Sequence, residues 1–133
     1  MALLSINPAT GQKIAGYDAM STAEVEEALE GCHGDFLAWR STPLGRRAEP
    51  LRRAAEILRA RRRPLAELMT AEMGKPVLQG EAEAEKCAAV CEYYADRGAD
   101  FLAEEPLASD AGESFVSFRP LGVILAVMLL IAP

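Results

Sequence analysis

The apolar pattern begins with two short β-type stretches on either side of a turn signal. The signal is Asn7–Gly11, which contains Pro8 and Gly11. Proline cannot donate to a β-ladder, and glycine tolerates a positive φ, so the chain is expected to reverse direction there. The pattern predicts a β-hairpin over residues 5–18, inside a hairpin region assigned to residues 1–20.

An amphipathic helix is predicted to begin at Ser21. Ser21 and Glu24 have capping-box spacing, in which each side chain accepts a hydrogen bond from the other residue's backbone N–H. Apolar residues then recur with the 3.6-residue period of a helix. This stripe consists of Val25, Leu29, Cys32, Phe36 and Trp39. We expect the stripe to be buried, because the large Phe36 and Trp39 side chains outweigh two helix-weakening glycines.

A second helix is predicted from about residue 44 to residue 73. It contains Pro50 and Pro64. An interior proline costs about 3 kcal/mol or more, so we expect a break or kink near each proline, or a helix that begins at Pro50. Gly74 is expected to end this helix as its C-cap, with Pro76 just beyond.

A third helix is predicted over about residues 77–102, and it completes a helical segment assigned to residues 21–105. One face is expected to pack inward, and the opposite face is acidic. The inner face is predicted to carry Ala84, Cys87, Ala88, Cys91, Tyr94 and Ala95. The outer face is predicted to carry Glu81, Glu83, Glu85, Glu92 and Asp96.

The last part of the chain has the pattern of strands, assigned to residues 114–133. Ser114–Arg119 alternates polar and apolar residues, as a half-buried strand does. Val123–Met128 is continuously apolar, which is typical of a strand buried on both faces of a parallel sheet. The expected fold class is therefore α/β: an N-terminal hairpin, three main helices and C-terminal strands that would join a parallel Rossmann-like sheet.

Composition narrows the class of protein. The chain has 133 residues, of which 50% are hydrophobic and 26% charged, as in a globular chain without a large multidomain architecture. No secretory signal is recognised at the N-terminus, and the apolar run from Leu121 to Pro133 is shorter than the roughly 20 residues that span a bilayer. We expect a cytoplasmic protein with no membrane partner.

Charge leaves one alternative open. The formal net charge of −6 disfavours nucleic-acid binding for the chain as a whole. Nine arginines nevertheless lie between Arg40 and Arg63, and they could form a phosphate-binding face. The other interpretation is a solvated helix surface, because Glu49 and Glu56 are interleaved with these arginines.

Four cysteine and histidine side chains and one Gly-Lys pair invite a chemical interpretation, and none gains one. His33 could act as a general base, but no nucleophile with an orienting partner is recognisable around it. Cys87 and Cys91 share one helix face, yet two thiols alone do not make a zinc site, and Cys32 has only His33 beside it. Gly74-Lys75 ends a helix instead of beginning one, so it is not a phosphate loop. We predict no catalytic, cofactor-binding or metal-binding residue.

Several segments, taken in order, resemble the NAD(P)-dependent aldehyde dehydrogenase superfamily, and one resembles its succinate-semialdehyde dehydrogenase branch. Glu72–Pro76 is the most specific match, and the branch is suggested by Glu85–Ala95. The matching segments are Ile6–Gly11, Phe36–Pro43, Arg52–Leu58, Glu72–Pro76, Glu85–Ala95 and Arg119–Val123. The resemblance implies an enzyme that oxidises an aldehyde, with succinate semialdehyde as the expected substrate, to a carboxylic acid with NAD or NADP.

The departures from the family qualify that implication. Family members are several times longer, and their nucleophilic Cys, general-base Glu and most of the cofactor pocket lie downstream. The family's oxyanion-binding Asn is replaced here by Ile131, which has no amide to donate. Ile6 and Glu72 resemble positions near a monovalent-cation site in some members. We expect an N-terminal fragment that is inactive alone and binds no cofactor.

Two other functions remain open beside this one. The chain could be a non-catalytic interaction module that pairs through its exposed C-terminal strand with a downstream dehydrogenase fragment or with a second copy. It could also be a basic helical nucleic-acid binder, although the overall charge argues for no nucleic-acid partner.

Overall fold

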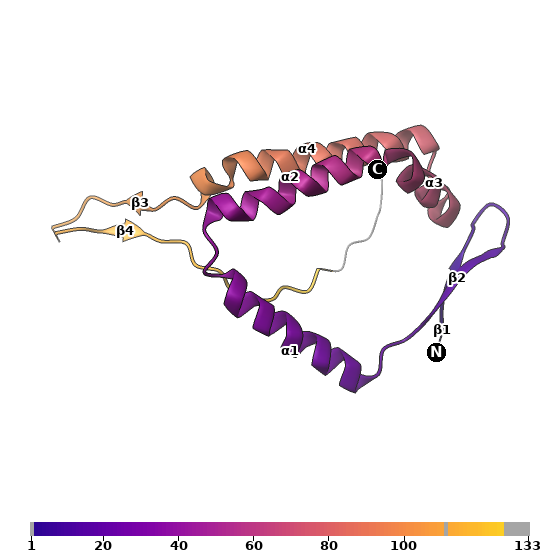
Figure 1. The fold of residues 1–133 in the computed structure, drawn as a ribbon, viewed down its shortest axis with the longest axis horizontal. Coiled ribbons are helices and arrows are strands. Elements are labelled where there is room, and N and C mark those ends of the chain that lie inside the picture. The colour runs from indigo at the N-terminus through magenta and orange to yellow at the C-terminus, as the bar shows by residue number, and fades with distance from the viewer. Residues whose placement is uncertain (1, 111, 127–133) are drawn as a thin grey trace.

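The computed structural model describes residues 2–110 and 112–126, and Figure 1 shows their arrangement. Two antiparallel strand pairs flank a set of four helices. In chain order the elements are β1 (Ala2–Ile6), β2 (Lys13–Asp18), α1 (Thr22–Trp39), α2 (Leu44–Ala60), α3 (Arg62–Met73), α4 (Val77–Phe101), β3 (Glu105–Pro106) and β4 (Phe115–Val116).

The predicted N-terminal hairpin is confirmed. β1 and β2 pair antiparallel from Ala2 opposite Asp18 onward, with one irregularity of register at the end of β1. Asn7 forms the turn, because its side-chain oxygen accepts hydrogen bonds from the backbone N–H groups of Ala9 and Thr10. Gly11 closes the turn with a φ of 69°, a conformation that favours glycine.

Helix α1 begins as predicted, but its expected burial is wrong. Ser21 and Glu24 form both hydrogen bonds of the capping box, at 2.7 and 3.3 Å. The apolar stripe nevertheless remains exposed: Leu29 and Trp39 keep 56% and 48% of their surface accessible, and no residue of α1 is buried. The physical reason is visible in Figure 1, where α1 stands apart from the other helices and its stripe has no helix to pack against.

The predicted second helix is divided in two. The break falls at Arg61, which has a φ of −102° and a ψ of 13° between α2 and α3. Pro64 lies in the first turn of α3, where a missing N–H costs no helical hydrogen bond. The expectation of a break or a helix start at Pro50 is wrong, because α2 continues through it from Leu44. Gly74 caps α3 in the left-handed conformation, as predicted.

Helices α2, α3 and α4 form one layer, because α4 runs back alongside the other two (Figure 1). The fully buried residues at their contact are all small, and larger side chains such as Leu51 and Leu65 are half-buried around them. The buried residues are Ala48, Ala55, Ala66, Gly80, Ala84 and Ala88. At Gly80, an added Cβ atom would lie 2.9 Å from both Cα and Cβ of Ala66, so only glycine fits there. We call residues 44–101 the helical layer.

The predicted inner face of α4 is partly confirmed. Ala84 and Ala88 are buried, and Cys91 and Ala95 are half-buried. Cys87 and Tyr94 are exposed, contrary to the prediction. The difference arises because α2 and α3 approach closest at the smallest residues of α4, which turns the larger side chains toward the flanks of the contact.

The C-terminal strands are shorter than predicted. β4 contains only two residues of the expected strand Ser114–Arg119, and it pairs antiparallel with β3. Val123–Ala126 has no strand structure, and the rest of the predicted strand Val123–Met128 lies outside the described residues. No parallel sheet is present among the described residues; a parallel strand needs neighbouring strands, which the described segments do not supply.

Candidate functional site

The residues that the sequence singled out for chemistry are not brought together. Cys32 and His33 lie on α1, whereas Cys87 and Cys91 lie on α4. The His33 ring packs beside Phe36, with 6.2 Å between ring centroids. Within residues 2–110 and 112–126, no group of three or more His, Cys, Asp or Glu side chains is placed to hold a metal ion.

The most organised polar feature is a line of ion pairs along the helical layer. Arg59 of α2 lies between two carboxylates of α4: its Nε donates to Glu85 at 2.7 Å, and its Nη2 donates to Glu92 at 2.8 Å. These hydrogen bonds raise the pKa of the Arg59 guanidinium, and the bond from Arg59 lowers the pKa of the Glu92 carboxyl. Arg59 therefore stays charged and joins α2 to two turns of α4.

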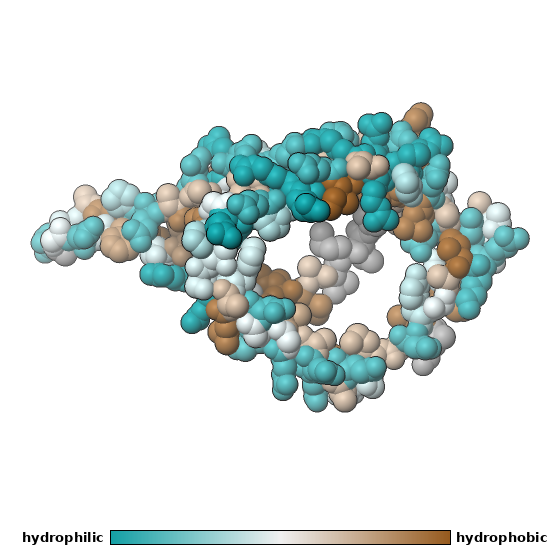
Figure 2. All heavy atoms as spheres, viewed as in Figure 1, coloured by the Kyte–Doolittle hydropathy of each residue, from teal (hydrophilic) through white to brown (hydrophobic). Residues whose placement is uncertain are grey.

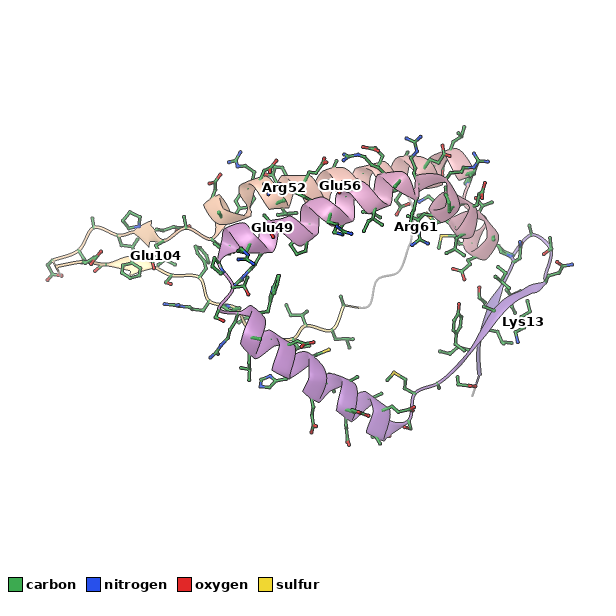
Figure 3. The ribbon with its side chains drawn as sticks, viewed as in Figure 1. Lys13, Glu49, Arg52, Glu56, Arg61 and Glu104 are labelled. Carbon is green, nitrogen blue, oxygen red and sulfur yellow. The ribbon has the colours of Figure 1, made fainter. Side chains whose placement is uncertain are left out.

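Three further ion pairs extend this line across the layer, which we call the charged seam. Arg52, in the middle of α2, pairs at 2.8 Å with Asp96 in the last turns of α4 (Arg52 is labelled in Figure 3). The other pairs are Arg63 with Glu81, and Lys75 with Glu83. The three arginines and their partners run in opposite directions along the chain, as the antiparallel packing of α2 and α3 on α4 requires; Lys75 lies in the turn before α4 and does not follow this order.

The charged seam changes the interpretation of the arginine run. Three of the nine arginines pair with carboxylates of α4, and Arg47 donates to the carbonyl oxygens of Thr42 and Arg40, which fixes the α1–α2 connection. The acidic face of α4, predicted to be only an outer surface, supplies these carboxylates. A signal was present in the sequence, since Arg52, Arg59 and Arg63 recur at i, i+7 and i+11, and the acidic partners also recur at helical spacing.

The turn between α3 and α4 is held by several polar contacts. The Thr70 hydroxyl lies 2.7 Å from the carbonyl oxygen of Lys75 and 2.9 Å from that of Ala66. The hairpin reaches the end of α3, because the Ser5 hydroxyl donates to Glu72 at 2.7 Å. The carboxylate that resembles a cation ligand of the family thus already has a protein partner on one oxygen.

An open hollow of about 560 Å³ separates α1 from the segment that follows β4. Its lining includes Phe36, Trp39 and Val123, with Asp35 as its only acidic side chain. Beyond it, residues 121–126 expose apolar surface, with Leu121 and Leu125 at 95% and 88% exposure. Figure 2 shows this contrast with the hydrophilic outer surface of the helical layer. The hollow offers mainly apolar contact area, with the Cys32 thiol and the Asp35 carboxylate also in its lining.

Neither the first turn of α1 nor the arginines of the charged seam offers a binding site for the phosphates of a dinucleotide cofactor. Phosphate groups bind at helix N-termini or beside unpaired cations. The first turn of α1 carries the acidic Glu24, whose pKa is lowered chiefly by the hydrogen bond from the Ser21 backbone N–H, so its carboxylate repels an anion there. The seam arginines Arg52, Arg59 and Arg63 are bound to carboxylates. No step of catalysis is therefore assigned to these residues.

Comparison with known proteins decides the family. The family model for the aldehyde dehydrogenase family matches residues 2–129. The chain belongs to the aldehyde dehydrogenase family. This confirms the family resemblance, whose segments run from the hairpin to the residues after β4.

Two relatives of the chain are succinate-semialdehyde dehydrogenases. The chain is 48% identical over 128 residues to the probable NADP-dependent succinate-semialdehyde dehydrogenase of Synechocystis, covering 96% of this chain and 28% of that relative. It is 40% identical over 125 residues to the NAD(P)-dependent succinate semialdehyde dehydrogenase Sad of Escherichia coli, covering 94% and 27%. The chain thus spans slightly more than a quarter of the length of these relatives.

A solved structure agrees with the fold. Succinic semialdehyde dehydrogenase from Streptococcus pyogenes, in complex with NADP+, superposes with a TM-score of 0.79 at 34% identity. The match covers 84% of this chain and 25% of that one. Among the described residues, no helix is long and apolar enough to cross a membrane.

Proposed function

We propose that this chain is the N-terminal section of an NAD(P)-dependent succinate-semialdehyde dehydrogenase of the cytoplasm. The observation that carries the proposal is the 48% identity to the Synechocystis relative over almost the whole chain. The parent reaction oxidises the aldehyde to a carboxylic acid by two electrons. Bound NAD(P)+ supplies the acceptor for the hydride, and water supplies the second carboxyl oxygen.

We further propose that the chain alone catalyses none of these steps and holds no cofactor. Its three cysteines lie on two separated helices, and His33 packs against Phe36 instead of facing a thiol. The role left to the chain is structural: the helical layer, the hairpin and the exposed apolar segment form a scaffold on which the catalytic part is completed.

A chimera tests the proposed function. In the Synechocystis relative, the matching section is replaced by residues 2–129 of this chain, and NADPH formation with succinate semialdehyde is measured. A folded chimera with activity near that of the intact relative supports the proposal, and the isolated chain is expected to show no activity above the no-enzyme control. A chimera that folds, as judged by gel filtration and thermal unfolding, but lacks activity contradicts it.

A matched control sharpens the assignment to the succinate-semialdehyde branch. The same section is taken from the betaine aldehyde dehydrogenase of Staphylococcus aureus, which is 23% identical to this chain and shares only its fold. If that chimera assembles and works as well as the first, the section carries no information about the branch.

A second function is favoured by the unpaired apolar segment after β4: assembly with a separately encoded dehydrogenase section. Ile124 and Leu125 keep 75% and 88% of their surface exposed, and the stripe of α1 is also uncovered. We expect the chain to co-purify with the remaining section of the Synechocystis relative when the two are co-expressed. Leu125→Asp should abolish co-purification, whereas Asp110→Asn, in the loop between β3 and β4, should not.

The nucleic-acid alternative is weakened, because three of the nine arginines, Arg52, Arg59 and Arg63, pair with carboxylates of α4. Retention of the chain on immobilised DNA, measured over a range of salt concentrations, is expected to be negligible even at low salt.

A further inference from the structure

One pair of side chains on α4 has no role in the scaffold described above. Cys87 and Cys91 are free cysteines, the first exposed and the second half-buried. They are separated by four residues on one helix, which places their Cβ atoms about 5–6 Å apart on the same face. Two accessible thiols at this separation can bind one ligand together.

The surroundings of the pair restrict which ligand fits. The carboxylates nearest in sequence already have partners, since Glu83 pairs with Lys75 and Glu92 pairs with Arg59. No described cluster of three or more His, Cys, Asp or Glu side chains includes the pair, so a tetrahedral zinc site is not formed. The ligand that fits the pair is therefore one that binds two thiolate sulfurs and needs no further protein ligand.

We propose that Cys87 and Cys91 form a bidentate site for a soft, thiophilic centre of low coordination number, with trivalent arsenic as its test case. Thiolate ligands prefer soft ions. Two bonds to sulfur of about 2.3 Å, which meet at about 100° in pyramidal trivalent arsenic, place the sulfurs about 3.5 Å apart, a span that thiols on adjacent helical turns can reach. The backbone of α4 needs no rearrangement, because the spacing of the pair is that of a regular helix.

The binding step balances without an oxidant. With phenylarsine oxide, the arsenic–oxygen bond is replaced by two arsenic–sulfur bonds. The two thiol protons leave with the oxygen as one water molecule, and arsenic stays trivalent throughout. The third cysteine, Cys32 on α1, has no thiol on its own helix and is expected to remain free.

The test uses the full chain with phenylarsine oxide in the presence of an excess of a monothiol. Intact-mass analysis is expected to show one arsenical per chain, and the number of titratable thiols should fall from three to one. Cys32→Ser should retain the arsenical. Cys87→Ser and Cys91→Ser should each weaken binding at least about a hundredfold, because the second bond is no longer intramolecular.

A variant that keeps the number of thiols tests the geometry directly. Cys91→Ser combined with Ala89→Cys leaves two thiols on α4 but places them two residues apart, on faces that do not meet. Circular dichroism confirms that each variant keeps its helices. Binding by this variant as tight as that of the unmodified chain, or loss of binding in Cys32→Ser, would overturn the proposal. Failure of the proposed enzymatic function would leave these results unchanged.

Discussion

The helical layer and helix α1 make an instructive contrast within one chain. α1 has a complete capping box and an apolar stripe at helical spacing, yet none of its residues is buried. The layer contains a proline inside α2 and helix ends without side-chain caps, yet it holds all the buried residues of the described chain. Local signals therefore determine where a helix forms, and partners determine what it buries.

The contacts between α2, α3 and α4 explain how the layer buries residues without α1. The buried centre of its contact consists of Ala and Gly, which let the helices approach closely, and the charged seam lies along the same helices. α1 instead presents large side chains, which gain stability only when a matching surface covers them. The layer therefore has a buried contact of its own, although Leu78 and Tyr94 keep 73% and 53% of their surface exposed, whereas the described residues provide no buried contact for α1.

The largest effect is expected from a charge placed inside the layer. Ala88→Asp puts a carboxylate at a position with 0% exposure, between Glu85 and Glu92, which already bind the neighbouring Arg59, and a poorly compensated buried charge costs at least about 3 kcal/mol. Urea unfolding of the chain, followed by circular dichroism, should show loss of the cooperative transition of the layer.

Two controls connect this result to the comparison. Ala89→Asp, on the exposed side of the same helix, should leave the unfolding midpoint almost unchanged. Leu29→Asp, on the stripe of α1, should also have little effect in the isolated chain, because Leu29 is already half exposed. A loss of stability in Leu29→Asp as large as that in Ala88→Asp would mean that α1 is buried in solution.

The next largest effect concerns the closest approach of two helices. Gly80→Ala brings a methyl group within 2.9 Å of the Ala66 backbone, so α3 and α4 must separate. We expect a loss of about 1–3 kcal/mol from overpacking, partly offset by the roughly 1 kcal/mol by which alanine favours a helix. Gly98→Ala in the same helix meets no atom within 4 Å and should stabilise the chain. If both variants stabilise, the small-residue contact is not tight.

Much of the fold follows from local sequence signals. The turn at Asn7–Gly11, the cap at Ser21 and the helix end at Gly74 depend on the conformations of single residues, and each is found where predicted. The continuation of α2 through Pro50 could not be predicted from local signals, because it depends on packing against α4. The predicted burial of the α1 stripe and the predicted parallel strand both require further segments to pack against. The described residues do not include such segments.

The candidate site was harder to predict than the fold. The acidic residues of α4 were assigned to a solvent-exposed face. Hydrophobic periodicity indicates that charged positions are not buried, but it does not identify the residues with which they pair. Their partners, such as Arg59, become visible only when two helices are set antiparallel and their charges are compared position by position. The separation of His33 from Cys87 and Cys91 depends on how α1 lies relative to α4, which no local pattern specifies.

A smaller effect is expected from the charged seam, because its groups are partly exposed. The Glu92 pKa lies below its ordinary value of 4.5, owing to the hydrogen bond from Arg59. Its contribution to stability is therefore present above pH 4.5 and is lost as the pH falls through the lowered pKa. Arg59→Gln should reduce the stability of the layer at neutral pH and flatten its dependence on pH in this acid range.

The matched control for the seam is Arg53→Gln, an exposed arginine on the same helix. It should leave the acid profile of unfolding unchanged, and added salt should reduce the difference between the two variants at neutral pH. Identical acid profiles for Arg59→Gln and the unmodified chain would remove the seam from the account of why the layer holds together.

The smallest effect on the whole chain is expected at the cap of α1. Ser21→Ala removes the hydroxyl that accepts from the Glu24 backbone N–H, so the first turn should fray while the layer stays intact. Amide hydrogen exchange should rise in the first turn of α1, and the urea midpoint of the layer should not move. Ser21→Thr keeps a capping hydroxyl and should restore protection.

The same cap gives α1 its own response to acid. The Glu24 pKa is lowered, chiefly by the hydrogen bond from the Ser21 backbone N–H, from an ordinary value of 4.5. The cap is therefore fully formed above that pH and weakens as the pH falls through the lowered pKa. If Ser21→Ala shifted the unfolding midpoint of the layer as much as Gly80→Ala does, the two regions would unfold as one unit. The contrast between the packed helical layer and the exposed helix α1 would then not hold in solution.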